Sequence, residues 1–167
     1  KLIIFEKYKN MKKNTIALSL IFCLFFLWAI SSNLLPTMIR QLMKTCELNT
    51  FEASFTESAY WLAYFICPIP IAMYMKRFSY RSGIIAGLLL AALGGLLFIP
   101  AAMVKSYGVY LCIFFIIATG MCFLETAANP YVTALGDPAT STRRLNLAQS
   151  FNGLGAFIAA MFLSKLV

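Results

Sequence analysis

The sequence predicts an all-α transmembrane protein, from its apolar composition, its scarcity of charge and the spacing of its apolar runs. Of the 167 residues, 61% are hydrophobic and 12% are charged, whereas a soluble domain is close to half apolar and a quarter charged. Mean hydropathy is +0.80. Apolar runs long enough to cross a bilayer, about 20 residues each, recur between short polar gaps. These observations exclude a soluble enzyme, a disordered segment and a secreted disulfide scaffold.

The chain divides into a polar N-terminal segment and five predicted membrane spans. The segment is 1–14, and the spans cover about 15–42, 53–75, 82–104, 107–135 and 145–167. Because Lys12 and Lys13 precede the first apolar run, a cleaved signal peptide is the alternative there. Four further spans favour a membrane helix instead.

Two spans carry features that shape a helix. Pro68 and Pro70 fall in the later half of the second span and are expected to bend it, since proline lacks an amide donor. The third span repeats small residues every four positions, a pattern that lets two helix backbones approach closely. These residues are Gly83, Gly87, Ala91 and Gly95.

The basic residues indicate the orientation of the spans. Ten of them precede span one, lie between spans two and three, or precede span five: Lys1, Lys7, Lys9, Lys12, Lys13, Lys76, Arg77, Arg81, Arg143 and Arg144. The opposite loops hold only Arg40, Lys44 and Lys105. The positive-inside rule therefore predicts a cytoplasmic N-terminal segment. This distribution explains the net charge of +8 without a nucleic-acid partner.

Catalytic and metal-binding residues are scarce. The sequence has no histidine, and its five cysteines include no CxxC pair. We therefore expect no metal, no cofactor and no enzymatic activity, because Ser-His, Cys-His and His-ligand chemistry are all excluded.

Glu125 is the strongest candidate functional residue, because it lies deep in the fourth span. A charge at mid-bilayer costs at least about 2.5–3.5 kcal/mol. Asn129 follows one helical turn later on the same face, and Pro130 frees a carbonyl near Thr126. The pattern predicts a polar surface that handles protons and binds substrate; a structural carboxyl bonded to a neighbouring helix is the alternative.

Further polar candidates lie in three other spans. Asn146, Gln149 and Asn152 share one face of span five, and amides suit hydroxyl-rich ligands because they both donate and accept hydrogen bonds. Asn33 lies in span one, where Trp28 is a candidate for stacking on a sugar. Helix–helix hydrogen bonding and an interfacial aromatic belt are the respective alternatives. Glu57, at the outer start of span two, either reaches water or carries a proton.

Two stretches resemble the pattern of the fucose–galactose–glucose proton symporters, a family of the major facilitator superfamily. They are Leu124-Glu-Thr-Ala-Ala-Asn-Pro-Tyr-Val-Thr-Ala-Leu-Gly136 and Arg144-Leu-Asn-Leu-Ala-Gln-Ser-Phe-Asn152. The resemblance extends over about 16–167 without gaps. It implies the first five of twelve helices of the major facilitator fold, in a multi-pass protein of the cell inner membrane. Its implied partners are the lipid bilayer and a C-terminal bundle of the same protein.

The resemblance also implies a function. It predicts a secondary active transporter that imports L-fucose or a related hexose with a proton, by alternating access between inverted repeats. The family's span-four carboxylate matches Glu125, its span-five amides match Gln149 and Asn152, and a span-one asparagine matches Asn33. The family's span-one aspartate, which takes up the proton, is replaced by Pro36.

Three explanations of the Pro36 replacement remain open. Glu125 carries the proton alone, Glu57 substitutes for the aspartate, or the protein is an uncoupled sugar facilitator. A non-transporting sensor or a truncated remnant of a permease is the rival class. Lys1 stands where a methionine is usual, Met11 resembles a natural start, and the last apolar run continues to Val167. We therefore expect an N-terminal part of a longer protein.

Overall fold

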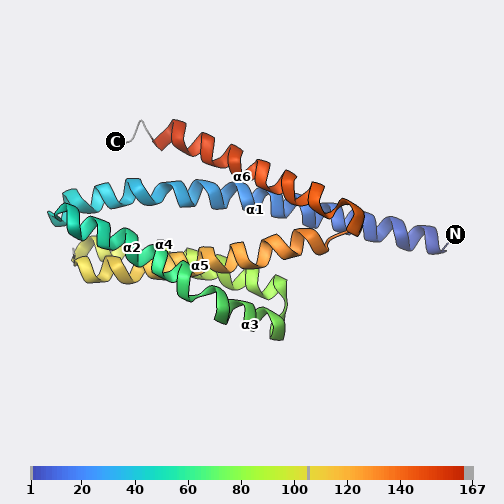
Figure 1. Cartoon of the computed structure of the whole chain (residues 1–167), viewed down its shortest axis with the longest axis horizontal. Helices are drawn as coiled ribbons and strands as arrows, with labels where there is room; N and C mark the ends of the chain where they lie inside the picture. The colour runs from blue at the N-terminus through green and yellow to red at the C-terminus, as the bar shows by residue number, and fades with distance from the viewer. Residues whose placement is uncertain (1, 105, 164–167) are drawn as a thin grey trace. The chain divides into compact units, whose positions relative to one another are not determined.

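The computed structural model is helical throughout its regular elements and confirms the all-α prediction (Figure 1). It describes the backbone of residues 2–104 and 106–163 and the side chains of 14–44, 46–104 and 106–162. Within these residues, no strand is present. The elements in chain order are α1 (Leu2–Cys46), α2 (Thr50–Ile66), α3 (Pro68–Phe78), α4 (Tyr80–Val104), α5 (Tyr107–Ala134), the 3-10 helix η1 (Pro138–Thr140) and α6 (Ser141–Leu163).

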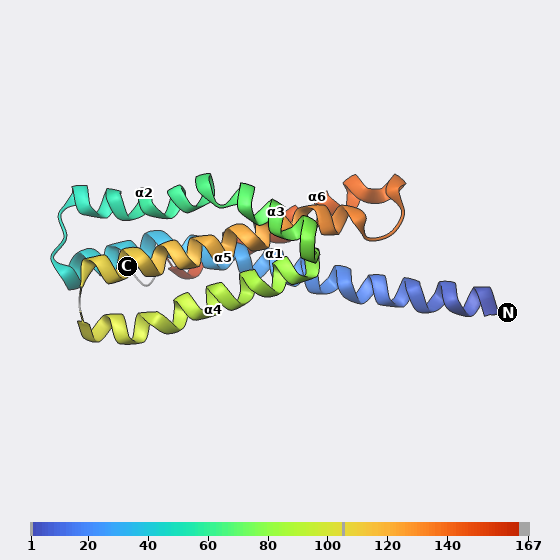
Figure 2. The same cartoon turned by 90° about the horizontal axis from the view of Figure 1, so that it is seen from below.

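Three helices are long and apolar enough to cross a membrane, within the residues described. They cover Asn14–Lys44, Tyr80–Val104 and Tyr107–Ala134, which correspond to predicted spans one, three and four. A fourth crossing is formed if α2 and α3, which meet at an angle of 42°, are one broken span. Figure 2 shows this bend, which confirms the effect expected of the prolines in span two.

The predicted fifth span corresponds to α6, which is not among the helices that meet this length and apolarity criterion over its described residues. Its first half contains the amide-rich strip, which lowers its apolarity. Residues 164–167 of the predicted span lie outside the described residues, so span five stays a prediction. The predicted orientation of the N-terminal segment also stays a prediction, because the side chains of residues 1–13 lie outside the described residues. The backbone of this segment is described from Leu2 onward, within α1.

The helices divide into two compact units, and the boundaries fall inside α1 and α5. The first unit comprises Lys1–Leu34 and Ala128–Val167, and the second comprises Leu35–Ala127. Each has its own apolar core.

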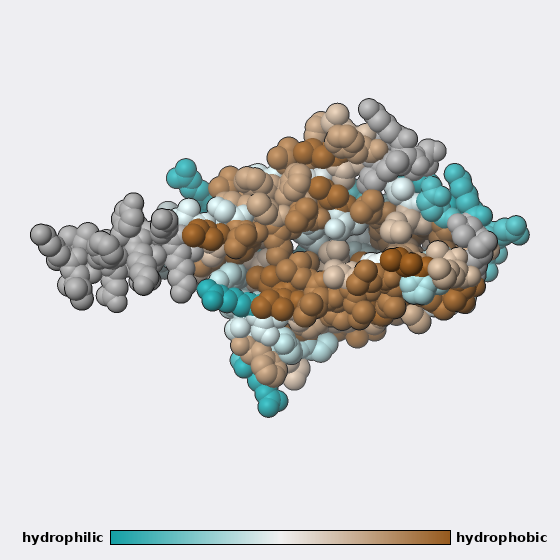
Figure 3. Space-filling model, turned by 180° about the vertical axis from the view of Figure 1, so that it is seen from behind, coloured by the Kyte–Doolittle hydropathy of each residue, from teal (hydrophilic) through white to brown (hydrophobic). Residues whose placement is uncertain are grey.

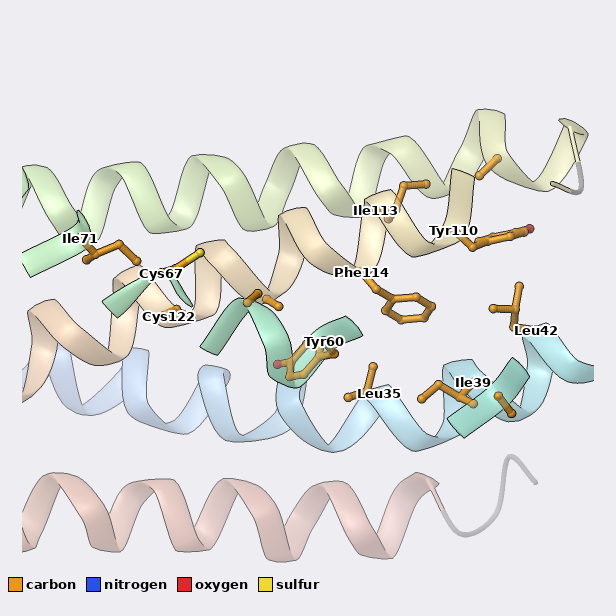
Figure 4. Packing of buried hydrophobic residues seen from close by; sticks show 14 of the residues in the cluster. Leu35, Ile39, Leu42, Tyr60, Cys67, Ile71, Tyr110, Ile113, Phe114 and Cys122 are labelled. Carbon is orange, nitrogen blue, oxygen red and sulfur yellow. The ribbon is translucent and has the colours of Figure 1, made fainter. Parts of the chain in front are cut away.

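The core of the second unit is a large cluster that joins α1, α2, α3, α4 and α5 (Figure 4). Its buried members are Leu35, Ile39, Leu42, Ala53, Tyr60, Ala63, Cys67, Ile71, Met75, Ala101, Tyr110, Ile113, Phe114, Ala118, Cys122 and Ala127. Small residues outside this cluster allow α4 and α5 to approach closely. A Cβ atom on Gly120 would lie 2.7 Å from the amide nitrogen of Ala91 and 2.9 Å from the carbonyl oxygen of Gly87.

This close approach confirms the packing expected of the small-residue repeat, except at its last position. Gly83 and Gly87 are buried against neighbouring atoms, but a Cβ atom on Gly95 would meet nothing within 4 Å. Gly94 occupies the contact instead and packs against Ile117. The prediction for Gly95 is therefore wrong, because a helix turns about 100° per residue and a four-residue repeat drifts about 40° at each step.

The core of the first unit is smaller. Its buried members are Ile21, Phe25, Ala128, Val132 and Ala148. Around them α6 runs beside the first part of α1 (Figure 1), where the rings of Phe22 and Phe151 stack with centroids 5.3 Å apart. A Cβ atom on Gly155 would lie 2.5 Å from the carbonyl oxygen of Phe26.

Large apolar side chains cover much of the surface, as the brown area of Figure 3 shows. Leu20 and Leu89 are each 66% exposed, and Phe65 is 83% exposed. In water such a surface would aggregate, whereas in a bilayer it faces hydrocarbon at no cost. The exposed residues thus agree with a protein whose helices are solvated by lipid.

Candidate functional site

The polar turn predicted in span four lies within α5. Glu125 and Asn129 are one helical turn apart and both are half-buried. Around them the helix is tightly packed, since Ala127 is 0% exposed and Ala128 is 1% exposed. Pro130 lies inside the same helix and removes the amide that would otherwise bond to the Thr126 carbonyl. The α5 segment therefore presents a carboxyl, an amide and a freed backbone carbonyl within two turns.

An amide of α6 meets this segment of α5. The Gln149 side chain donates from Nε2 to Oδ1 of Asn129 at 3.2 Å. Asn152 follows three residues after Gln149 and is half-buried, whereas Asn146 is exposed. Ala148 is 0% exposed in the first unit's core, which fixes the face that α6 turns toward the protein. The structure thus brings together two of the amides that the sequence analysis singled out.

The α1 candidates contact their own helix. Asn33 donates from Nδ2 to the carbonyl of Ala29 at 2.7 Å, and Ser32 donates to the carbonyl of Trp28 at 3.0 Å. Trp28 packs edge-on against Phe25 with ring centroids 6.1 Å apart. Its Nε1 atom is buried and has no hydrogen-bond partner among the described residues. An unpaired buried donor is costly, so this indole offers a hydrogen bond to an incoming polar group.

Glu57 lies on α2 in the second unit, where it is exposed. It is thus on a different helix from the amides of α5 and α6. Pro36, which replaces the aspartate expected from the family, lies inside α1 and is also exposed.

Arg144 makes contacts that the sequence analysis did not predict, since it appeared there only as a basic residue that indicates topology and as the first residue of a stretch that resembles the family. Its guanidinium donates to three backbone carbonyls at the junction of α5 and α6: Val132 at 3.2 Å, Thr133 at 3.0 Å and Asp137 at 2.8 Å. A sequence clue exists in Gly136-Asp137-Pro138, a turn motif followed within one helical turn of α6 by an arginine. Arginine after a helix end is well suited to bind its free carbonyls.

The chemistry available here is hydrogen bonding and proton binding. Amide groups and an indole N–H can bind hydroxyls, and the carboxyl can accept or donate a proton. Within the described part of the chain, no group of three or more His, Cys, Asp or Glu could hold a metal ion.

Apolar spans that carry a carboxyl and amides within them define an integral membrane protein of the polytopic α-helical class. The chain matches the Major Facilitator Superfamily over residues 16–167 and belongs to that family. Its relatives in that family are transporters rather than enzymes.

Individual relatives are similar over most of this chain. The L-fucose-proton symporter of Escherichia coli (strain K12) is 47% identical over 152 residues, which are 91% of this chain and 35% of that protein. A glucose/galactose transporter of Brucella abortus is 39% identical over 158 residues, which are 95% of this chain and 38% of that protein. The chain thus spans about a third of the length of the curated relatives it matches.

A solved structure also resembles this chain. The crystal structure of the transporter FucP in the outward conformation matches with a TM-score of 0.80 and 47% identity. The match covers 92% of this chain and 37% of that one. The major facilitator fold predicted from the sequence is therefore confirmed.

Proposed function

We propose that this chain is part of a proton-coupled sugar permease that imports L-fucose or a related hexose by alternating access. The observation that carries the proposal is the Glu125–Asn129 turn within an apolar span, with Gln149 hydrogen-bonded to Asn129. The printed functions of the relatives, L-fucose-proton symport and glucose/galactose transport, support a hexose as the substrate.

Hexose recognition would use the polar side chains of three helices. Gln149, Asn129 and Asn152 offer donors and acceptors to ring hydroxyls, and Asn33 would add an acceptor through its side-chain oxygen. The buried indole N–H of Trp28 would gain the partner that it lacks, and the Trp28 ring would stack on a sugar face. When sugar enters, the Gln149–Asn129 hydrogen bond would be exchanged for bonds to the hydroxyls.

Proton coupling would use Glu125, which also contacts the sugar. A carboxylate in an apolar span is costly, at least about 2.5–3.5 kcal/mol, so the carrier reorients with the carboxyl neutral. The proton and the sugar enter together from the outside and neutralise both the charge and the unpaired polar groups. Loss of the proton to the cytoplasm then releases the sugar.

The remaining parts of the proposal concern the location. The protein would be a multi-pass protein of the cell inner membrane, with residues 1–14 in the cytoplasm as the distribution of basic residues indicates. It would need a second bundle, which corresponds to the part of the relatives that this chain does not span. Five spans cannot enclose a two-sided pathway alone.

An uncoupled facilitator is the second candidate, because Pro36 stands in α1 where the family carries its proton-binding aspartate. Proline cannot titrate, so coupling would need Glu125 or Glu57. If neither carries a proton, sugar would equilibrate across the membrane without accumulating.

Sugar-induced proton movement tests the proposal. Cells expressing the complete protein would be suspended anaerobically in weak buffer, and external pH would be recorded on adding L-fucose, D-galactose or D-glucose. Alkalinisation is expected with at least one of the sugars. Entry of labelled sugar without a pH change would replace symport by facilitated diffusion, and neither event with any sugar would favour a sensor or a non-transporting remnant.

A matched pair of variants then assigns the proton. Glu125→Gln removes the carboxyl from the α5 turn and keeps its shape, and it is expected to abolish accumulation of sugar against a gradient. Glu57→Gln makes the same change at an exposed position of α2 and is expected to leave accumulation intact. The opposite pattern would transfer the proton to Glu57, and concentrative uptake in both variants would refute a carboxyl carrier in this chain.

A further inference from the structure

The junction between α5 and α6 is held by one side chain. Arg144, in the first turn of α6, donates from Nε to the Val132 carbonyl and from Nη2 to the Thr133 carbonyl. It donates from Nη1 to the Asp137 carbonyl and to the Thr140 hydroxyl. One guanidinium of α6 thus binds the last turn of α5, the connecting turn and the end of η1.

These bonds matter because the last four carbonyls of a helix have no partner within it. Val132 and Thr133 belong to this group in α5, which ends at Ala134. The connecting turn is ordered separately by Asp137, whose side chain accepts from the Ala139 amide at 3.0 Å. Arginine is suited to bind the free carbonyls at the end of α5, because its N–H donors point in fixed directions within one plane, whereas the lysine ammonium is a single point charge.

The same two helices carry the amide pair of the candidate site. Asn129 lies three residues before Val132 on α5, and Gln149 lies five residues after Arg144 on α6. At a rise of about 1.5 Å per residue, both intervals are short enough for the junction to set the register of the pair. Between them, Val132 and Ala148, each 0% exposed, belong to the same buried cluster.

We propose that Arg144 is a positioning residue, which fixes α6 against α5 so that Gln149 reaches Asn129. Its three carbonyl contacts set the height and rotation of the first turns of α6, and the Val132–Ala148 packing transmits that register to Gln149. A shift of α6 by one residue would turn Gln149 by about 100° and separate the amides. The inference rests on the proposed function only in assigning a sugar to this amide pair.

The test is Arg144→Lys in the complete protein, with Arg143→Lys as the matched control. Arg143 is the neighbouring, exposed arginine. Both variants keep the positive charge and lose a guanidinium, but only Arg144→Lys removes the guanidinium that binds the junction carbonyls. Hydrogen–deuterium exchange of the backbone amides over residues 130–150 measures directly how stable the junction is. Transport kinetics of labelled L-fucose, normalised to folded protein, read the amide pair.

We expect Arg144→Lys to speed amide exchange at the junction and to raise KM for L-fucose by about three- to tenfold, which corresponds to loss of about one hydrogen bond. Maximal velocity per folded protein should change less than KM, and Arg143→Lys should change neither. A merely structural role would lower the amount of folded protein and leave KM as it is.

The outcomes separate the two proposals. Unchanged exchange in Arg144→Lys would overturn the role of Arg144 at the junction. Faster exchange with an unchanged KM would overturn its effect on the amide pair. If the parent protein transports none of L-fucose, D-galactose and D-glucose, the proposed function fails, while the exchange result still supports or overturns the junction role by itself.

Discussion

The two units of the chain differ in what fills their interiors. The second unit buries sixteen residues in one apolar cluster, including the large rings of Tyr60, Tyr110 and Phe114. Among its described residues, the first unit has a buried cluster of five, which includes the ring of Phe25. Most of the candidate sugar-binding side chains, Trp28, Asn33, Asn129, Gln149 and Asn152, belong to the first unit.

A close-packed interior has few arrangements open to it, whereas polar side chains with a small core around them can exchange partners when a ligand arrives. Asn129 belongs to the part of α5 that lies in the first unit. Substitutions in the second unit should therefore act on stability, apart from those at the candidate proton carriers Glu125 and Glu57, which belong to that unit. Substitutions in the first unit should act on stability and sugar affinity together.

The largest expected effect is at Gly120 in the second unit. Gly120→Ala would place a Cβ atom 2.7 Å from the Ala91 nitrogen and 2.9 Å from the Gly87 oxygen. Both neighbours are backbone atoms that cannot rotate away, so α4 and α5 must separate. We expect a loss of about 1–3 kcal/mol of stability, measured by thermal unfolding in detergent.

Gly95→Ala is the control for Gly120, since a Cβ atom there meets nothing within 4 Å. Its stability should change by less than about 1 kcal/mol, because only helix propensity is altered. Equal effects of the two variants would contradict the close approach of α4 and α5. A change in KM for sugar in Gly120→Ala, measured on the folded fraction, would contradict the expectation that such substitutions in the second unit act on stability.

A similar test in the first unit uses Gly155 and Gly153. Gly155→Ala would bring a Cβ atom to 2.5 Å from the Phe26 oxygen, whereas Gly153→Ala meets nothing within 4 Å. We expect Gly155→Ala to destabilise by about 1–3 kcal/mol and also to raise KM for the sugar, because Asn152 lies less than one turn away. Thermal unfolding should show the loss of stability, and transport kinetics of the same variant should show the higher KM. A loss of stability with unchanged KM would place Asn152 outside the binding region.

Tyr107 tests a polar contact within the second unit. Its hydroxyl donates to the Glu52 carbonyl at 2.9 Å and accepts from the hydroxyl of Thr56, which is 0% exposed, at 3.4 Å. Tyr107→Phe should cost about 0.5–1.5 kcal/mol in thermal unfolding. Tyr110→Phe, which removes a hydroxyl from a buried ring of the same helix, is the control and should cost less. Both variants keep the ring, so equal losses would show that the hydrogen bonds of the Tyr107 hydroxyl do not account for the loss.

The sequence predicted the helical class and the bend at Pro68 because both depend on local chemistry. Composition decides whether a helix is solvated by lipid, and a missing amide acts within one turn of its proline. The sequence-based prediction of packing was wrong at Gly95, because a four-residue repeat departs from the 3.6-residue period of the helix. Which of two adjacent glycines faces a partner depends on the accumulated rotation of the helix, and Gly94 makes the contact.

The candidate site was predictable only in part for a similar reason. The relation of Glu125 to Asn129 follows from spacing within one helix. The Gln149–Asn129 hydrogen bond joins two helices across twenty residues, and its register depends on how α5 and α6 meet. Arg144 was visible as a charge, but the three carbonyls that surround it come from the end of another helix and the following turn. No periodicity in the sequence reports such a contact.

The smallest expected effect concerns a residue with a positive φ angle, of which each unit has an example. Gly136, after α5, has φ of 94°, and Ser79, between α3 and α4, has φ of 140°. Glycine adopts positive φ at little cost, whereas serine is strained there. Ser79→Gly should therefore stabilise the protein by about 0.5–1 kcal/mol. The substitution relieves backbone strain of about 1–3 kcal/mol. That gain is partly offset by the greater entropy of glycine in the unfolded chain and by loss of the weak 3.4 Å hydrogen bond from the Ser82 amide to the Ser79 hydroxyl. Ser79→Ala removes that bond and keeps the strain, so it should stabilise nothing in the same unfolding measurement. A gain in Ser79→Ala equal to that in Ser79→Gly would show that the hydroxyl, and not the backbone of this turn, is unfavourable in the second unit.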